Sequence, residues 1–86
     1  MKARVFVTLK PSVFDPQGRA IVEALHSLGY ATVADLRQGK YFDLDLDVAS
    51  ASAAETLAAE IAERVLANPV IESFRVQIDP PPGGAR

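Results

Sequence analysis

The sequence contains no cysteine and no tryptophan, and its only histidine is His26. Without cysteine the chain can form no disulfide, no thiolate metal site and no cysteine nucleophile, so its fold must depend on packing. Hydrophobic residues still make up 49% and charged residues 23% of the 86 positions, a balance typical of a globular chain. A chain of this length buries enough surface for one small domain only.

An excess of basic charge and a long apolar run are also missing. Nine Lys and Arg against eleven Asp and Glu give a formal net charge of -2, which lacks the basic footprint that nucleic-acid binding needs. No apolar run approaches the roughly 20 residues that span a bilayer, and the first residues alternate in polarity instead of forming a signal-peptide core. We therefore expect a cytoplasmic protein with neither nucleic acid nor membrane as a partner.

The first third of the chain predicts a strand followed by a helix. Residues 2–9 alternate between apolar and polar positions, which is typical of a half-buried strand, and Pro11 ends it. Asp15 and Pro16 form a strong helix start, since the aspartate can cap free amides and proline fits the first helical position. The helix should run from 16 to 28 and end at Gly29. Its apolar stripe comprises Ile21, Ala24, Leu25 and Leu28.

Residues 33–48 predict extended structure around Gly39. After this glycine one face is apolar and the other is acidic through Asp43, Asp45 and Asp47. A two-residue hairpin at Gly39 would move Leu36 onto the acidic face, because residues flanking such a loop share a side. The alternation of apolar and polar residues on the two sides of Gly39 therefore favours one long bent strand, or a three-residue turn between two strands, over a tight hairpin.

The last third of the chain predicts a second helix and a final strand. Ser52 and Glu55 fit a capping box, and an alanine-rich stretch with Leu57, Ile61 and Val65 at helical spacing extends to about residue 67. Asn68 and Pro69 should end this helix. Residues 70–79 alternate as a strand, and the Pro- and Gly-rich residues 80–86 predict a disordered tail outside a single domain of residues 1–79.

Together these elements predict an α+β fold, a two-layer sandwich related to the ferredoxin-like βα(β)βαβ plan. Each helix has one apolar stripe and each strand one apolar face, which both helices would cover from one side of the sheet. The other face would stay open and carry the aromatic residues Phe6 and Tyr41 among compensating charges. Because such a face resembles a subunit contact, we expect the chain to associate with itself as a dimer or tetramer.

Residues that carry chemistry are sparse. The three aspartates at 43, 45 and 47 lie about 7 Å apart along a strand, too far to share one metal ion, and His26 has no neighbouring hydroxyl or carboxylate pattern. Residues 10–18 lack the glycines and Lys-Ser/Thr of a phosphate loop, which favours helix capping and a partner contact. Arg37 and Lys40 flank Gly39, and the residues alone leave solubility and docking onto an acidic surface equally open. We expect no catalytic, cofactor or metal site in this chain.

Three strings of the chain stand out: Val7-Thr8-Leu9-Lys10-Pro11 leading into Asp15-Pro16-Gln17-Gly18, then Val33-Ala34-Asp35-Leu36-Arg37-Gln38-Gly39-Lys40, and Leu66-Ala67-Asn68-Pro69-Val70-Ile71-Glu72. Together they closely resemble PurS, the small subunit of phosphoribosylformylglycinamidine synthase. They occur in the family's order, and the resemblance runs from Met1 to about Ile78. The departures are small: Ser12 and Phe14 replace smaller or aliphatic residues, and the second helix is richer in alanine than in glutamate.

The resemblance implies a noncatalytic adaptor in purine synthesis. In this family a glutaminase subunit (PurQ-like) releases ammonia, and a large synthetase subunit (PurL-like) uses ATP and Mg²⁺ to convert formylglycinamide ribonucleotide to formylglycinamidine ribonucleotide. The PurS-like chain would bridge the two and bind no cofactor itself. The alternative from another class is a ferredoxin-like ligand-sensing regulatory module, but the chain offers no ligand-reading cluster. The expected assembly contacts are Lys10, Pro11, Asp15, Gln17, Gly18, Arg37, Gly39, Lys40, Tyr41, Phe6, Asn68 and Pro69.

Overall fold

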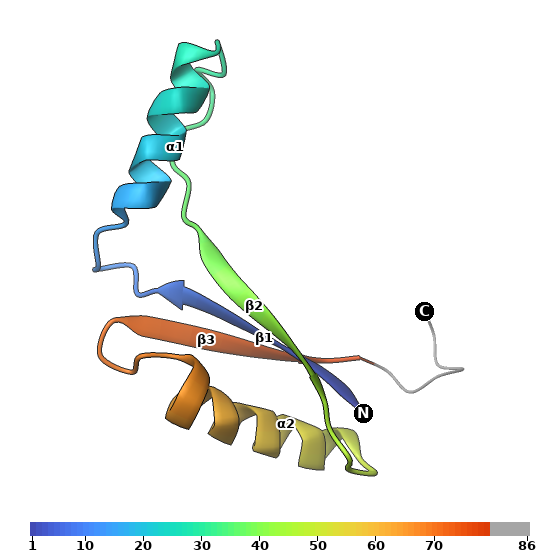
Figure 1. The fold of residues 1–86 in the computed structure, drawn as a ribbon. Coiled ribbons are helices and arrows are strands. Elements are labelled where there is room, and N and C mark those ends of the chain that lie inside the picture. The colour runs from blue at the N-terminus through green and yellow to red at the C-terminus, as the bar shows by residue number, and fades with distance from the viewer. Residues whose placement is uncertain (80–86) are drawn as a thin grey trace.

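A computed structural model describes residues 1–79, and the tail expected at 80–86 lies outside the described residues. Its elements are β1 (Lys2–Leu9), α1 (Pro16–Ser27), β2 (Gly39–Asp45), α2 (Ala51–Ile61), the π-helical turn η1 (Ala62–Leu66) and β3 (Glu72–Ile78). The strands form one antiparallel sheet in the order β2-β1-β3. Figure 1 shows α2 lying along one face of this sheet, which confirms the predicted α+β class.

The core lies between β1 and the helix formed by α2 and η1. On β1 the alternate residues Ala3, Val5 and Val7 are buried, as the period-2 pattern predicts. Ala58 and Ala62 pack against them from the helix, and their small side chains allow a close approach. The larger apolar residues packed around this cluster are only partly buried, namely Phe42, Leu44, Leu46, Leu66, Phe74, Val76 and Ile78. The core of this chain by itself is therefore small.

The first helix differs from its predicted place on the sheet. Figure 1 shows α1 projecting beyond the end of the sheet, beside the segment that returns to β2. Its buried residues are Gly18 and Val22, whereas Ile21 and Leu28 of the predicted stripe are 38% and 74% exposed. The prediction of two helices on one face is thus wrong for the chain by itself, because α1 packs against the returning segment and not against the sheet. We call residues 11–38 the arm.

The stretch around Gly39 contains one short strand that begins at the glycine, so the expected long bent strand over 33–48, and its alternative of two strands, are both wrong. Within the described residues, 33–38 pair with no strand, and β2 begins at Gly39 opposite Thr8. A Cβ atom on Gly39 would lie 2.4 Å from the carbonyl oxygen of Val7, so the strands approach too closely here for any other residue. The predicted alternation of apolar and polar faces after the glycine is confirmed, since Phe42 and Leu44 are half-buried and their neighbours in the strand are exposed.

The second helix begins two residues earlier than predicted and ends differently. Ser50, not Ser52, is the N-cap, and its side-chain oxygen accepts a hydrogen bond from the Ala53 amide. The last turn is π-helical, with the Ala67 amide donating to the Ala62 carbonyl over 2.9 Å. Because a π turn holds more residues than an α turn, Val65 is exposed, where the regular spacing predicts burial.

The final strand begins at Glu72 instead of residue 70. Before it, Asn68 ends the helix as predicted, and its side chain accepts a hydrogen bond from the Val70 amide over 3.0 Å. Val70 and Ile71 are exposed in this turn. Among residues 1–79, none of the helices combines the length and apolar character needed to cross a membrane.

Candidate functional site at the junction of arm and sheet

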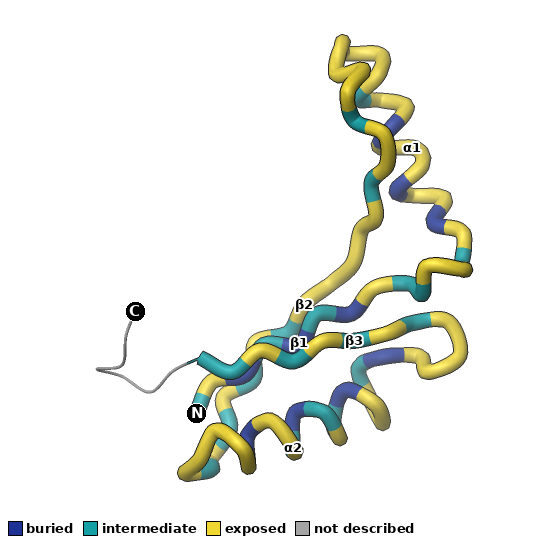
Figure 2. Tube along the Cα trace, turned by 180° about the vertical axis from the view of Figure 1, so that it is seen from behind, coloured by how far each residue is buried: buried dark blue, intermediate teal, exposed yellow. Residues whose placement is uncertain are grey.

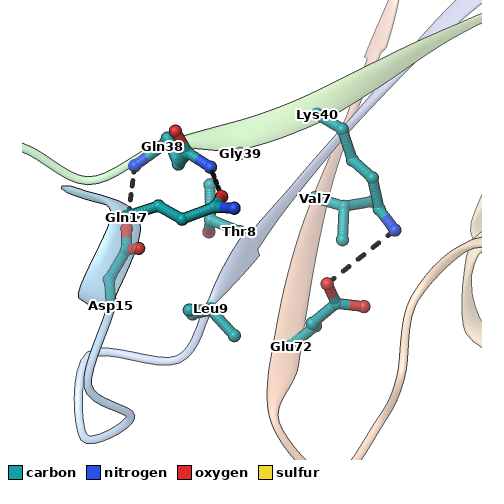
Figure 3. A pocket seen from close by; sticks show the side chains of 9 residues that line it. All are labelled: Val7, Thr8, Leu9, Asp15, Gln17, Gln38, Gly39, Lys40 and Glu72. Atoms are coloured by element: carbon teal, nitrogen blue, oxygen red, sulfur yellow. Dashed lines mark hydrogen bonds and ion pairs between the residues drawn. The ribbon is translucent and has the colours of Figure 1, made fainter. Parts of the chain in front are cut away.

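Asp15 joins the start of α1 to the segment that returns from it. Its Oδ1 accepts a hydrogen bond from the Gly18 amide over 2.9 Å, which is the N-cap contact that the sequence predicts. Its Oδ2 accepts a hydrogen bond from the Gln38 amide over 3.0 Å, and the side-chain amides of Gln17 and Gln38 also bond to each other (Figure 3). The carboxylate is 5% exposed. One buried side chain therefore holds both ends of the arm together.

The surroundings of Asp15 favour its charged form. The backbone amide of Gly18 lowers the pKa of this carboxyl most, followed by the amide of Gln38, and the positive charge of Arg37 acts in the same direction. Burial opposes these contacts but does not outweigh them. The carboxylate is therefore ionised at neutral pH and available as a double acceptor.

Gly18 allows the helix and the returning segment to touch. A Cβ atom at this position would lie 2.5 Å from the backbone oxygen of Leu36 and 2.7 Å from Oδ2 of Asp15. Real Cβ atoms do not approach other atoms so closely, so any side chain would push the two segments apart. The glycine is required by packing, although it lies in the first turn of a helix.

Arg37 and Lys40, the two cations around Gly39, have different surroundings. The Nη2 atom of Arg37 donates hydrogen bonds to the backbone oxygens of Lys10 and Val13, over 2.9 and 2.8 Å. Arg37 therefore holds the loop after β1 in place. The Nζ atom of Lys40 lies 3.9 Å from a carboxylate oxygen of Glu72, and the lysine side chain stays 54% exposed. Both residues are exposed, but Arg37 is tied to the backbone by two hydrogen bonds and Lys40 is held by a longer ion pair.

A shallow pocket of about 300 Å³ lies where the arm meets the sheet, and Asp15 and Lys40 are among its lining residues (Figure 3). Its lining combines two carboxylates, two amides, one ammonium and one hydroxyl, which can bind a polar partner through several hydrogen bonds. In the part of the chain that the structure describes, no group of three His, Cys, Asp or Glu is arranged to hold a metal ion. The lining residues are Val7, Thr8, Leu9, Asp15, Gln17, Gln38, Gly39, Lys40 and Glu72.

The open face of the sheet carries a second cluster. Phe6 and Tyr41 stack with their ring centroids 5.8 Å apart, and the Arg75 guanidinium lies 4.4 Å from the centroid of Phe6. Arg4 pairs with Asp43 over 3.1 Å and with Asp79 over 3.5 Å. The charges on this face therefore compensate each other within the chain, as the sequence predicts. Tyr41 remains 57% exposed.

The sequence-predicted contacts thus fall into three groups. Asp15, Gln17, Gly39 and Lys40 line the junction pocket, with Gly18 against Asp15 and with Lys10, Pro11 and Arg37 beside it. Phe6 and Tyr41 belong to the open face, and Asn68 and Pro69 form the turn before β3. His26 lies outside these groups and makes an exposed 2.6 Å contact with the Val33 backbone oxygen.

The expected assembly contacts leave out three residues of these clusters. Gln38 contributes its backbone amide to Asp15, which side-chain chemistry does not reveal. Glu72 interrupts an apolar strand face, and that interruption was a readable sign that its carboxylate has a partner. Arg75 shares strand parity with Phe6, but only the observed register places the two opposite each other.

A small α+β chain with a polar junction pocket and an aromatic sheet face has the features of a protein-binding module. The family described as "PurS: Phosphoribosylformylglycinamidine (FGAM) synthase" matches residues 2–80, and the chain belongs to this family. By that membership it is a subunit of FGAM synthase in purine biosynthesis.

Three relatives illustrate the match. The phosphoribosylformylglycinamidine synthase subunit PurS of Bacillus subtilis (strain 168) is 44% identical over 78 residues, which cover 91% of this chain and 92% of the relative. The crystal structure of PurS from Methanocaldococcus jannaschii, one of the subunits of formylglycinamide ribonucleotide amidotransferase in the purine biosynthetic pathway, is 32% identical with a TM-score of 0.80 over 88% of this chain and 92% of that one. A chain in the structure of PurLQS from Thermotoga maritima is 29% identical with a TM-score of 0.80 over 88% of this chain and 93% of that one.

Proposed function

We propose that this chain is the noncatalytic adaptor of its FGAM synthase and joins the glutaminase subunit to the ATP-dependent synthetase subunit so that ammonia passes between them. The observation that carries the proposal is the likeness to a chain of the PurLQS structure, whose name combines PurS with PurL and PurQ. We further propose that residues 1–79 act as one domain, that the chain works in the cytoplasm, and that it associates with itself as a dimer or tetramer.

The chemistry gives a physical reason for an adaptor. The complete reaction converts formylglycinamide ribonucleotide, glutamine, ATP and water to formylglycinamidine ribonucleotide, glutamate, ADP and phosphate. Ammonia in neutral water is mostly ammonium, which has no lone pair for attack. Two active sites that exchange ammonia must therefore be docked and shielded from solvent. A third chain can supply this docking by binding energy alone, while the partner synthetase uses ATP and Mg²⁺.

The junction pocket and the open face are the surfaces that we assign to the two partners. The junction offers donors and acceptors of both charges around an accessible ammonium, that of Lys40. The open face offers an exposed aromatic ring, that of Tyr41, in a row with Phe6 and Arg75. Aromatic and arginine side chains are the residue types most enriched where protein interfaces bind tightly. Lys10, Pro11, Gln17, Asn68 and Pro69 belong to the same proposed contact set.

Reconstitution with purified PurL-like and PurQ-like subunits tests the adaptor role. We expect glutamine-dependent synthesis to require this chain, whereas synthesis from a high concentration of added ammonium should depend on it much less. The chain alone should show neither glutaminase nor ATPase turnover. Unchanged glutamine-dependent synthesis in its absence would contradict the proposal. An equal loss of the glutamine- and ammonium-dependent reactions would also contradict it, because that would place the chain in the synthetase reaction itself.

A further inference from the structure

A groove lies at the outer edge of β3, on the side of the sheet away from β2. Its volume is about 280 Å³, and it is bounded by η1, the turn that follows η1 and the start of β3. Ser73 and Phe74 both line it, although neighbouring strand residues point to opposite faces of a sheet. One groove reaches both side chains because it lies at the edge of the strand. The lining residues are Glu63, Ala67, Pro69, Glu72, Ser73 and Phe74.

The backbone of β3 has an unused hydrogen-bonding edge beside this groove. Among residues 1–79, β3 pairs with β1 only. The Asp79 amide donates to the Lys2 carbonyl over 3.0 Å, so the odd-numbered residues of the strand face β1. Because backbone groups alternate in direction along an antiparallel strand, the amides and carbonyls of Phe74 and Val76 point outward. An extended segment of another protein can add a strand at such an edge.

The lining of the groove is mostly apolar. Ala67, Pro69 and Phe74 contribute apolar surface, and the turn that bounds the groove also carries Val70, which is 77% exposed. Figure 2 shows this turn, which leads from the second helix into β3, as exposed. A cavity of about 150 Å³ holds a benzene ring, so a groove of about 280 Å³ has room for a large apolar side chain.

The two charged residues that line the groove are both acidic, and only one of them has a partner. Glu72 accepts a hydrogen bond from the Asn68 amide over 2.7 Å and lies 3.9 Å from the ammonium of Lys40. Glu63 is exposed and belongs to none of the ion pairs within residues 1–79. A basic side chain from another protein would therefore be attracted to Glu63. A second copy of this chain, docked through the same edge, would instead bring its own glutamates to this place.

We propose that this edge and groove bind an extended segment of a partner subunit of FGAM synthase. The segment adds a strand along β3 and bonds to the backbone of Phe74 and Val76. A large apolar side chain of the segment fills the groove, and a Lys or Arg beside it pairs with Glu63. In contacts of this kind the backbone bonds supply affinity and the pocket supplies specificity. The inference rests on the proposed function and deepens it, because it gives the chemistry that recognises the turn of Asn68 and Pro69.

Charge reversal at Glu63 tests the docking. Glu63→Lys changes an exposed residue, so we expect a native circular dichroism spectrum. Labelled chain would be titrated with the purified PurL-like and PurQ-like subunits, singly and together. We expect binding to one of the two to weaken by about tenfold or more, with the larger loss at low salt. The matched control is Glu55→Lys, an exposed glutamate near the other end of the same helix, which should bind as wild type does.

Wild-type affinity of Glu63→Lys for both subunits would overturn the proposal. An equal loss of affinity in Glu63→Lys and Glu55→Lys would also overturn it, because the effect would then come from the net charge of the chain and not from the groove.

Amide hydrogen exchange tests the added strand without any substitution. In the free chain the amides of Phe74 and Val76 should exchange rapidly, while those of Ser73 and Arg75, which face β1, should be protected. Addition of the partner subunits should slow exchange at Phe74 and Val76 by about tenfold or more and leave the other two slow. Protection of Phe74 and Val76 in the free chain would show that a second copy covers the edge, and fast exchange in the complex would show that no strand is added. Either result would overturn the proposal.

The docking site and the adaptor role fail in different ways. If glutamine-dependent synthesis still requires the chain, but Glu63→Lys binds both subunits with wild-type affinity, the docking site is wrong and the adaptor role stands. If glutamine-dependent synthesis does not require the chain, the adaptor role is wrong, and the docking site falls with it.

Discussion

The carboxylate of Asp15 accepts a hydrogen bond from the backbone amide of Gln38, 23 residues further along the chain. This contact closes the arm on itself, because the same carboxylate also caps α1 through Gly18. The two ends of the arm therefore move as one unit. Substitutions at this junction should show how firmly the arm is held.

The stability of the junction should depend on the charge of Asp15. Because its pKa is lowered in the folded chain, its contribution is fully present above the pKa of about 3.9 of an unfolded aspartate, and it is lost as the pH falls through the folded pKa. We expect Asp15→Asn to be less stable than wild type at pH 7, with a difference that shrinks below pH of about 4. Urea titrations at a series of pH values measure this.

The matched control is Asp45→Asn, which removes an exposed carboxylate from β2. If the two variants lose the same stability at every pH, the Asp15 contacts do not hold the arm.

Gly18→Ala should destabilise the chain, although alanine ordinarily favours a helix by up to about 1 kcal/mol over glycine. The added methyl would meet Leu36 and Asp15 at distances that force the segments apart. Forced overpacking of this kind costs about 1–3 kcal/mol, which exceeds the gain in helix propensity, so the substitution should lower the stability of the chain and not raise it. Thermal melts compare it with Glu23→Ala at an exposed position further along the same helix. A Gly18→Ala variant that melts above wild type would show that the arm is not packed closely here.

Substitutions of Arg37 and Lys40 should distinguish a residue that stabilises the fold from one that contacts a partner subunit. Arg37→Ala removes both hydrogen bonds to the loop of Lys10 and Val13, and we expect a loss of about 1–2 kcal/mol. Lys40→Gln removes one exposed ion pair and should change stability by less than about 1 kcal/mol. If Lys40 docks onto an acidic partner surface, Lys40→Gln should also weaken the three-subunit assembly, most strongly at low salt. Gel filtration measures this assembly. If the Lys40→Gln variant assembles as well as wild type at every salt concentration, Lys40 is an ordinary solvated surface residue.

Leu44→Asp should unfold the chain. Leu44 lies on the apolar face of β2, is half-buried and packs against the core cluster, so a carboxylate there would lose part of its hydration without gaining a partner. That cost is several kcal/mol, against a total stability of about 5–15 kcal/mol. Gln77→Asp, on the open face of β3, is the control and should keep a normal circular dichroism spectrum. Normal melts for both variants would mean that β2 contributes little to the core.

Local patterns in the sequence determined β1, the start of α1 and the family. Alternation places the buried residues of β1 correctly, because strand side chains point to opposite faces whatever surrounds them. Asp15 with Pro16 begins α1 as predicted, since a cap depends on neighbouring backbone amides only. The three strings that resemble PurS are likewise a property of the chain alone, and the family match over residues 2–80 confirms them.

The tertiary structure alone decided which surface covers which. The stripe of Ile21 and Leu28 marks one side of α1 as apolar, but nothing local says whether the sheet, the returning segment or another chain lies against it. Only the structure shows that Ser50 and not Ser52 is the N-cap of α2, and that a π turn precedes Ala67. The sequence does not show that Arg37 has partners, because the two backbone oxygens that accept its hydrogen bonds are brought to the guanidinium by the fold. Periodicity encodes the polarity of a face, whereas the partner of that face depends on contacts between residues far apart in the chain.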